Sequence, residues 1–190
     1  MKSDLTSERH ILSRKIKVVR NAVFSTVLLG FTTVLPLSVA AGADILISPE
    51  TLRLIPRKQV VLVDTRSSLK YLLGHIPGAA HLGNWEDFTH RVGGVRGLLI
   101  EDKEFIAERL RAFGVTRNKT IVFYGEPSDP WRADGRFLWM FERYGFDRVA
   151  ILEGGLVGWQ KTGGTIERGR GDKPSPSSLA AGDIHLSDLV

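Results

Sequence analysis

The sequence predicts an α/β protein in which a parallel sheet is flanked by helices on both faces. Three segments, at 59–64, 121–124 and 148–152, are short runs of mainly apolar residues that are rich in β-branched and aromatic side chains. A continuous apolar run is typical of a strand that is buried on both faces. Segments with apolar residues at helical spacing lie between these runs, so helices should connect the strands.

The first half of the body alternates short strands and short helices. We expect a strand at 45–47 and then a helix at 51–55, which begins with Ser48, Pro49 and Glu50. These three supply an N-cap, a proline that needs no N–H partner, and an acid near the positive end of the helix dipole. The strand at 59–64 leads into a helix at 67–73. A short edge strand at 79–82 and one helical turn at 84–88 follow.

The second half contains the longer helices. Residues 91–100 form a glycine-rich connection, and Asp102 then caps a helix that ends at Gly114. The strand at 121–124 is followed by a loop at 125–132 and by a helix that Gly145 ends. The strand at 148–152 leads through a glycine turn into a last helix at 156–161. Residues 165–183 are rich in Gly, Pro, Ser and charge, which is typical of a linker.

Residues 1–43 differ from the body and indicate an exported protein. Six basic and two acidic residues precede an uncharged apolar stretch at 22–43, which ends in small residues suited to signal-peptide cleavage after Ala40 or after Ala43. Pro36 within the stretch favours a cleaved secretory signal. The alternative is an uncleaved anchor in the inner membrane, because about 20 apolar residues can span a bilayer. In either case the body should be periplasmic or extracellular.

The composition excludes several kinds of site. The 190 residues include no cysteine, so the chain can form no disulfide, no thiolate metal site and no cysteine nucleophile. His75, His81 and His90 have a spacing that fits no usual metal-ligand pattern, and we expect neither a metal nor a cofactor. The net charge is +5, but the body has no basic stripe interleaved with aromatic residues. We therefore expect no nucleic-acid partner.

Four stretches of the body resemble the rhodanese-like domain, the module of thiosulfate and mercaptopyruvate sulfurtransferases. They are Val-Asp-Thr-Arg at 63–66, Gly-His-Ile-Pro-Gly-Ala at 74–79, the strand and loop at 121–125, and Leu-Glu-Gly-Gly-Leu at 152–156 with Trp159. The resemblance covers residues 45–164, so we assign the domain to residues 44–164. It implies a rhodanese-like five-stranded parallel sheet flanked by helices on both faces.

The insertion Gly97-Leu98-Leu99 is similar to the N-terminal half of tandem, two-domain sulfurtransferases. In such pairs, the resemblance implies, the active site belongs to the second domain and faces the first, which is typically free of cysteine. Residues 165–190 would then be a linker and the start of a missing second domain. A second rhodanese domain is therefore the expected partner.

The resemblance also locates the missing nucleophile. In active members the strand ends in a cysteine whose thiolate carries the transferred sulfur as a persulfide, and Gly125 falls at that place. Two prolines remove N–H donors from the equivalent loop, and two acids oppose the binding of an anion such as thiosulfate. We therefore expect the domain to be inactive alone. The loop residues are Gly125, Glu126, Pro127, Ser128, Asp129, Pro130, Trp131 and Arg132.

Three other residues could face a substrate. Asp64 and Arg66 could bind it, but an ion pair that fixes the end of the strand is favoured. Lys70 falls near a basic, substrate-binding residue of active domains. His75 could be a base or a ligand, and a role in ordering the turn is again favoured.

Two loop residues allow other functions. Ser128 could replace cysteine as the nucleophile of a hydrolase, although no Gly-x-Ser-x-Gly elbow surrounds it. Trp139 and Trp159 fall at core spacing on helices, which leaves Trp131 as the tryptophan to test as a ligand contact.

The leading hypothesis is the structural half of an exported tandem thiosulfate sulfurtransferase. The alternative is a binding or scaffold module with membrane attachment through residues 22–43.

Overall fold

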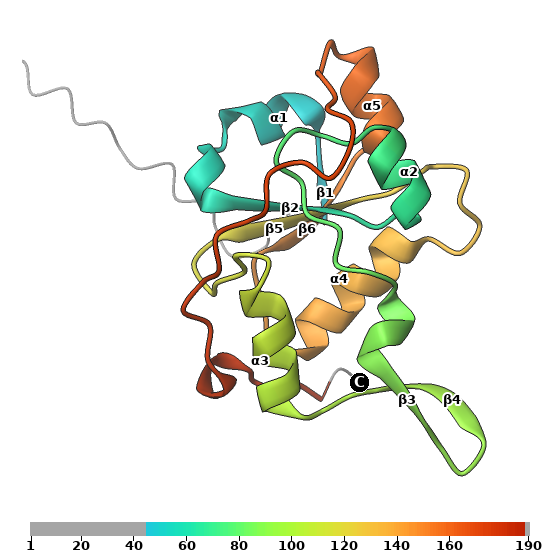
Figure 1. Ribbon diagram of the computed structural model, residues 1–190, viewed down its shortest axis with the longest axis vertical. Helices are drawn as coiled ribbons and strands as arrows, with labels where there is room; N and C mark the ends of the chain where they lie inside the picture. Colours follow the sequence, from blue (N-terminus) through green and yellow to red (C-terminus); the bar gives the residue numbers. More distant parts are fainter. Residues whose placement is uncertain (1–44, 189–190) are drawn as a thin grey trace, which may run out of the picture. The chain divides into compact units, whose positions relative to one another are not determined.

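The computed structural model describes residues 45–188, so the predictions for residues 1–43 lie outside the described residues. Its centre is a four-stranded parallel sheet in the order β1–β6–β5–β2 (Figure 1). β5 and β2 pair along their full length, from Val60 opposite Thr120 to Asp64 opposite Tyr124. The predicted α/β class and parallel sheet are confirmed. The strands are β1 (Leu46–Ile47), β2 (Val60–Asp64), β5 (Thr120–Tyr124) and β6 (Val149–Leu152).

The fifth strand of the prediction is reduced to a single bridge at Ala80, which pairs with Val63. The Asp64 N–H donates to the Ala80 carbonyl at 2.9 Å, and the Ala80 N–H donates to the Leu62 carbonyl at 2.8 Å. Gly78 and Gly83, on either side, have φ angles of +70° and +90°. The chain therefore turns away before and after Ala80, and the sheet has four strands where five were expected.

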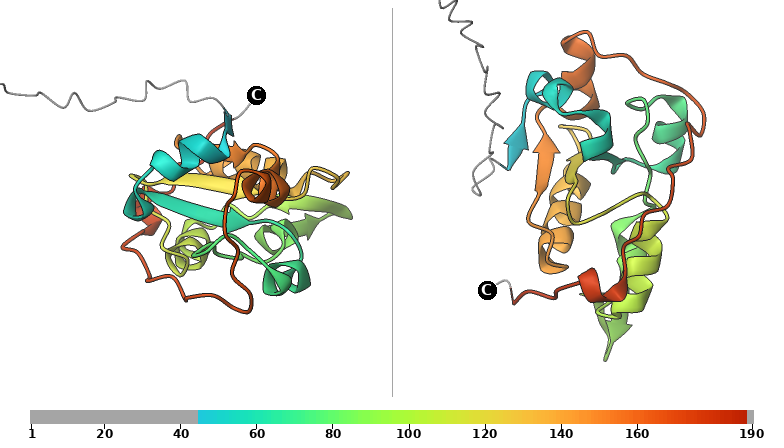
Figure 2. Two further views of the ribbon diagram at one scale, coloured as in Figure 1. Left: turned by 90° about the horizontal axis from the view of Figure 1, so that it is seen from above. Right: turned by 90° about the vertical axis from the view of Figure 1, so that its left-hand side faces the viewer.

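Helices cover both faces of the sheet (Figure 2). On one face α3 (Lys103–Arg111) and α4 (Ala133–Arg143) pack against Ile121 and Phe123. On the other, α1 (Pro49–Leu54) and α5 (Gly155–Lys161) pack against Val122 and Tyr124. The two faces alternate along β5 because successive side chains of a strand point in opposite directions. The shorter elements are α2 (Ser68–Leu73), η1 (Arg57–Gln59), η2 (Trp85–Phe88) and η3 (Ala181–Asp183).

None of the helices between residues 45 and 188 combines the length and the apolar character that a bilayer span requires. The stretch at 22–43, on which membrane attachment was predicted, lies outside this part of the chain.

The glycine-rich connection of the prediction forms a hairpin. β3 (Thr89–Val92) pairs antiparallel with β4 (Val95–Leu99), and the pair projects away from the sheet in Figure 1. Gly93 and Gly94 make the turn with φ angles of +54° and +88°. Positive φ at both turn residues matches the twist of two antiparallel strands, and glycine adopts it without steric cost.

The described part of the 165–190 segment lies along the domain. Glu167 and His75 exchange both of their backbone hydrogen bonds, each at 2.9 Å. Further on, Leu179 and Ile184 are buried in the cluster that α3 and α4 also form, and η3 lies against α3 (Figure 1, red). The segment has little regular secondary structure, yet its apolar side chains belong to the core. A linker to a second domain stays a prediction.

Candidate functional site

The loop at 125–132 connects the carboxyl end of β5 to α4. Gly125 is buried, and a Cβ placed on it would lie 3.1 Å from the hydroxyl oxygen of Thr65. The Leu156 N–H donates to the Gly125 carbonyl at 3.3 Å. A side chain on Gly155 would collide with that same carbonyl, so α5 can approach the loop this closely only with glycine at position 155.

Asp129 contacts the backbone of its own loop and the first residue of α4. Its carboxylate accepts the backbone N–H of Trp131 at 3.0 Å and that of Ala133 at 3.4 Å. Amide groups at the N-terminus of a helix are the usual partners of a bound anion. A carboxylate of the protein itself therefore occupies one amide of the loop and one at the start of α4.

The remaining charges of the loop are also paired. Lys70 Nζ lies 2.5 Å from a carboxylate oxygen of Glu126, so the structure brings Lys70 from α2 to the loop. Arg132 has a φ of +47°. Its guanidinium donates to both carboxylate oxygens of Asp134, at 3.0 and 3.1 Å. The hydrogen bonds and charge of Asp134 raise the pKa of Arg132 above its ordinary value. Asp134 is 5% exposed, and the sequence analysis did not single it out.

The other loop residues make fewer contacts. Ser128 is exposed, and among residues 45–188 no hydrogen bond joins it to a histidine. Pro127 lines a small pocket beside Gly125, and Pro130 is exposed. A serine nucleophile therefore has no visible general base in the described part of the chain.

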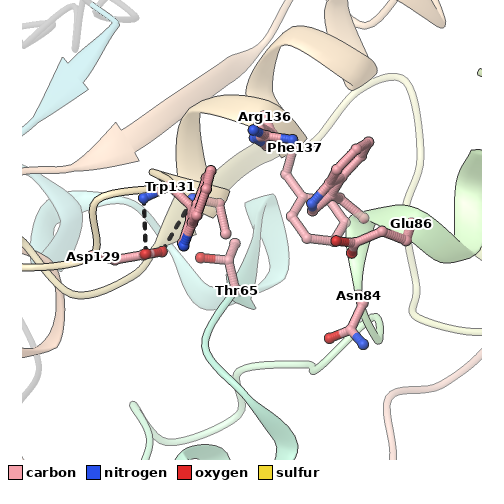
Figure 3. Close-up of a pocket in the computed structure, with 9 residues that line it drawn as sticks. Thr65, Asn84, Glu86, Asp129, Trp131, Arg136 and Phe137 are labelled. Atoms are coloured by element: carbon pink, nitrogen blue, oxygen red, sulfur yellow. Dashed lines mark hydrogen bonds between the residues drawn. The ribbon is translucent and has the colours of Figure 1, made fainter. Parts of the chain in front are cut away.

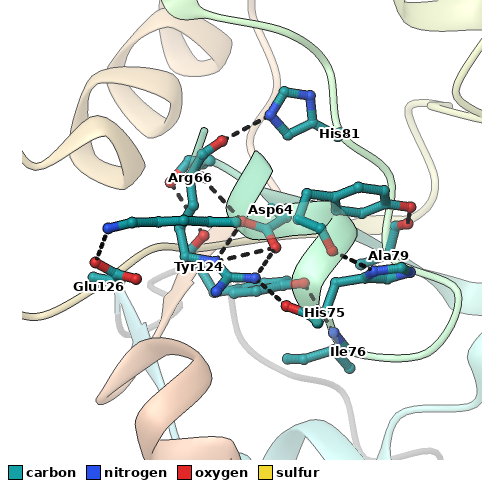
Figure 4. A network of polar contacts seen from close by, with 12 residues as sticks. Asp64, Arg66, His75, Ile76, Ala79, His81, Tyr124 and Glu126 are labelled. Atoms are coloured by element: carbon teal, nitrogen blue, oxygen red, sulfur yellow. Dashed lines mark hydrogen bonds and ion pairs between the residues drawn. The ribbon is translucent and has the colours of Figure 1, made fainter. Parts of the chain in front are cut away.

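Asp64 and Arg66 form a buried ion pair at the end of β2 (Figure 4). The Arg66 guanidinium contacts both carboxylate oxygens, at 2.6 to 3.2 Å, and also donates to the Gly74 carbonyl. Their side chains are 0% and 8% exposed, which leaves neither free to meet a substrate. Burial, together with the charge of Asp64, raises the pKa of the neighbouring Tyr124. The Tyr124 hydroxyl accepts the Ile76 N–H at 3.0 Å, which ties β5 to the turn.

His75 is fully buried and orders this turn. Its ring stacks on Tyr71 with centroids 3.8 Å apart. Nδ1 lies 2.9 Å from the Tyr71 carbonyl, and Nε2 lies 2.9 Å from the Glu167 carboxylate. In the part of the chain that the structure describes, no group of three His, Cys, Asp or Glu residues is placed to hold a metal ion.

A pocket beside the loop brings together residues that the sequence did not connect (Figure 3). Asp129 and Trp131 lie on one side, and Asn84 and Glu86 lie on the other, with Thr65 between them. Trp85 and Arg136 also line it. No motif links η2 to this loop, because the two segments are far apart in the chain and meet only through the packing of α4. Of the tryptophans expected in the core, Trp139 is instead 49% exposed, whereas Trp159 is partly buried.

Comparisons with known proteins agree with the fold. A family model described as the rhodanese-like domain matches residues 48–162. A thiosulfate sulfurtransferase of Corynebacterium glutamicum is 34% identical over 99 residues, which are 52% of this chain and 31% of that protein. A 3-mercaptopyruvate sulfurtransferase of Escherichia coli is 31% identical over 118 residues, which are 62% of this chain and 41% of that protein. The chain thus matches less than half the length of either relative.

Solved structures show the same likeness. The crystal structure of SseA from Escherichia coli, a 3-mercaptopyruvate sulfurtransferase, has a TM-score of 0.63 at 24% identity, covering 76% of this chain and 56% of that one. The 3-mercaptopyruvate sulfurtransferase of Leishmania major has a TM-score of 0.58 at 20% identity, covering 72% and 40%. At these identities the likeness establishes the fold.

Proposed function

The chain belongs to the rhodanese-like domain family, and we propose that it is a non-catalytic member, the structural half of an exported tandem thiosulfate sulfurtransferase. One observation carries this proposal: Gly125 directly follows β5, in a chain without cysteine, and the Asp129 carboxylate holds the amides of Trp131 and Ala133. The fold is that of sulfur-transferring enzymes, but the position that would hold the sulfur has no side chain.

The chemistry supports an inactive loop. A persulfide intermediate requires a thiolate nucleophile, and glycine supplies none. The surroundings do not favour an anion either, because Asp134 is buried beside Gly125 and Asp129 uses the amides at the start of α4. Loss of the nucleophile and loss of the anion site point to the same conclusion.

Length and sequence support the tandem and exported parts of the proposal. The chain matches 31% and 41% of the lengths of the two sulfurtransferases described above. That share is what one domain of a two-domain enzyme would give. The uncharged stretch at 22–43 behind a basic segment supports export.

The experiment is an assay of thiocyanate formation from thiosulfate and cyanide with the purified full chain. We expect no turnover above the rate without protein, while an active 3-mercaptopyruvate sulfurtransferase run with its own substrate serves as the positive control. Turnover that scales with the concentration of this protein would overturn the proposal.

The alternative function is a binding or scaffold module held at the membrane through residues 22–43. The mass of the exported protein tests the membrane attachment in this alternative, although a soluble scaffold would give the same mass as a cleaved protein. A mature N-terminus at Ala41 or Asp44 excludes the anchor, whereas retention of residues 22–43 in a membrane fraction favours it.

A further inference from the structure

The pocket beside the loop has the size and composition of a ligand site. Its volume is about 490 Å³. Small-molecule sites occupy roughly 300–1,000 Å³ and combine aromatic walls with a few polar groups. Here the buried side chains of Phe137 and Thr65 lie beside two indoles, those of Trp85 and Trp131. Gly125 itself is not part of the pocket lining, although Thr65, which lines the pocket, lies beside Gly125.

The charged lining of this pocket is net negative. Glu86 and Asp129 supply carboxylates from opposite sides, as Figure 3 shows, and Arg136 is the one basic residue in the lining. The Arg136 guanidinium already lies over Trp85, with Cζ 4.5 Å from the ring centroid. One indole of the pocket therefore holds a cation that belongs to the protein.

The second indole of the pocket, that of Trp131, has a free ring face. Trp131 is 72% exposed, and none of the ring-stacking or cation–π contacts found among residues 45–188 involves it. Its backbone N–H donates to the Asp129 carboxylate at 3.0 Å, so the backbone that carries the indole is held at an acid. An aromatic face next to a carboxylate is the combination that recognises organic cations.

We propose that this pocket binds an organic cation on an apolar stem, a guanidinium or an ammonium, which lies over Trp131 between Asp129 and Glu86. The stem lies against Phe137. The stack of Arg136 on Trp85 shows the same contact within the same pocket. The chemistry is shared by a free amine and by an arginine or lysine side chain of another protein.

The test uses the full-length protein and four matched probes: butylguanidinium, butylammonium, butanol and butyrate. Binding is followed through the indole N–H signals of the four tryptophans by NMR, with that of Trp131 assigned from its loss in Trp131→Phe. We expect the two cations to shift the Trp131 signal saturably, with weak affinity, and the neutral and anionic probes to leave it in place. Equal shifts with butanol or butyrate, or no saturable shift with either cation, would overturn the proposal.

Four variants locate the site. Trp131→Ala and Glu86→Gln should each weaken binding about two- to fivefold, the range of an exposed cation–π contact or ion pair. Binding to Trp131→Ala, which lacks the reporting indole, is followed through the signal of Trp85, the other indole in the pocket lining. Arg136→Gln should tighten binding, because it removes a like charge and uncovers the second indole. Trp139→Ala is the matched control, because Trp139 is a half-exposed tryptophan on α4, the helix of Arg136, and lies outside the pocket lining. An effect of Trp139→Ala as large as that of Trp131→Ala would contradict the site.

A capped tripeptide with a central arginine identifies the source of the cation. Binding of this peptide indicates a protein side chain, and binding of the free cations alone indicates a small molecule. Both results support the site. Because none of the probes contains sulfur, the outcome does not depend on whether the protein transfers sulfur.

Discussion

Gly125 is a position where a side chain would be tightly placed and would have no helpful partner. A Cβ there would lie 3.1 Å from the hydroxyl oxygen of Thr65 and 3.7 Å from Cγ of Asp134. Thr65 is fixed, because its hydroxyl donates to the Tyr124 carbonyl at 3.1 Å. A thiolate in this position would meet a buried carboxylate, which disfavours its negative charge.

Gly125→Cys is therefore expected to give an unactivated thiol, with a pKa above the ordinary cysteine value of about 8.5. The rate of alkylation by iodoacetamide as a function of pH measures it. The double variant Gly125→Cys with Asp134→Asn should show a lower thiol pKa, because the carboxylate is gone and the Arg132 cation remains. A thiol pKa in the single variant well below the ordinary value would contradict this description of the loop.

Tyr124 and Tyr144 lead to a prediction about alkaline pH. Burial raises the pKa of each above the ordinary value of 10.0. Above that value the tyrosines ionise in the unfolded chain but stay neutral in the folded one, so the free energy of unfolding should fall as the pH rises. Urea denaturation between about pH 9 and pH 11 measures the fall. Tyr144→Phe should make it less steep, and an equally steep fall in that variant would contradict the assignment.

The sequence predicts only part of the site at the scale of residues. Residue type and neighbouring motifs are enough to predict three features. These are the absence of cysteine, the pairing of Asp64 with Arg66, and the role of His75 in ordering the turn. The closeness of Asp134 to Gly125 does not, because it depends on where α4 begins in space. Trp85 was missed for a similar reason, since only the packing of η2 on α4 brings it to the pocket.

At the scale of elements, the start of α4 is held by a residue of the preceding loop. Asp129→Ala removes the carboxylate from the Trp131 and Ala133 amides, and this should lower the free energy of unfolding by about 1 kcal/mol, the usual net value of a hydrogen bond. Ser128→Ala, at the exposed neighbouring position, should leave stability unchanged. Urea denaturation of both variants measures the difference, and equal stabilities would show that Asp129 does not stabilise the start of α4.

The buried strands and the longer helices could be predicted closely because their apolar patterns are strong. β2 and β6 lie within the predicted runs, β5 begins one residue before its predicted run, and Asp102 caps α3 as expected. The β3–β4 hairpin was missed because its side chains are largely exposed, so no apolar alternation marks it. The fifth strand was overestimated because its length depends on a partner strand that lies elsewhere in the chain.

At the scale of the whole domain, the segment after residue 164 completes the core. Leu179→Ala should lower the free energy of unfolding by about 2–5 kcal/mol, as large-to-small changes at buried positions do. Ser178→Ala, at the exposed position before it, is the matched control and should be neutral. Thermal and urea unfolding check both variants, and a neutral Leu179→Ala would mean that the segment is not packed in solution.

The composition of the segment after residue 164 does not predict that the segment packs against the domain. Gly, Pro and Ser predict an irregular path, and the path is largely irregular. They do not reveal where the path runs, because its attachment depends on Glu167 beside His75 and on a few apolar side chains such as Leu179 and Ile184. The fold class can thus be predicted from the apolar pattern of the sequence. The attachment of the segment after residue 164 depends on long-range contacts, which only the structure shows.

The central claim is that the loop after β5 cannot receive a sulfur-bearing anion. Crystals of the protein soaked with thiosulfate test it most directly. We expect no thiosulfate at Gly125, and we expect the Asp129 carboxylate to keep its hydrogen bonds to the amides of Trp131 and Ala133. A thiosulfate ion bound by the main-chain amides of residues 125–132, with Asp129 displaced, would contradict the account.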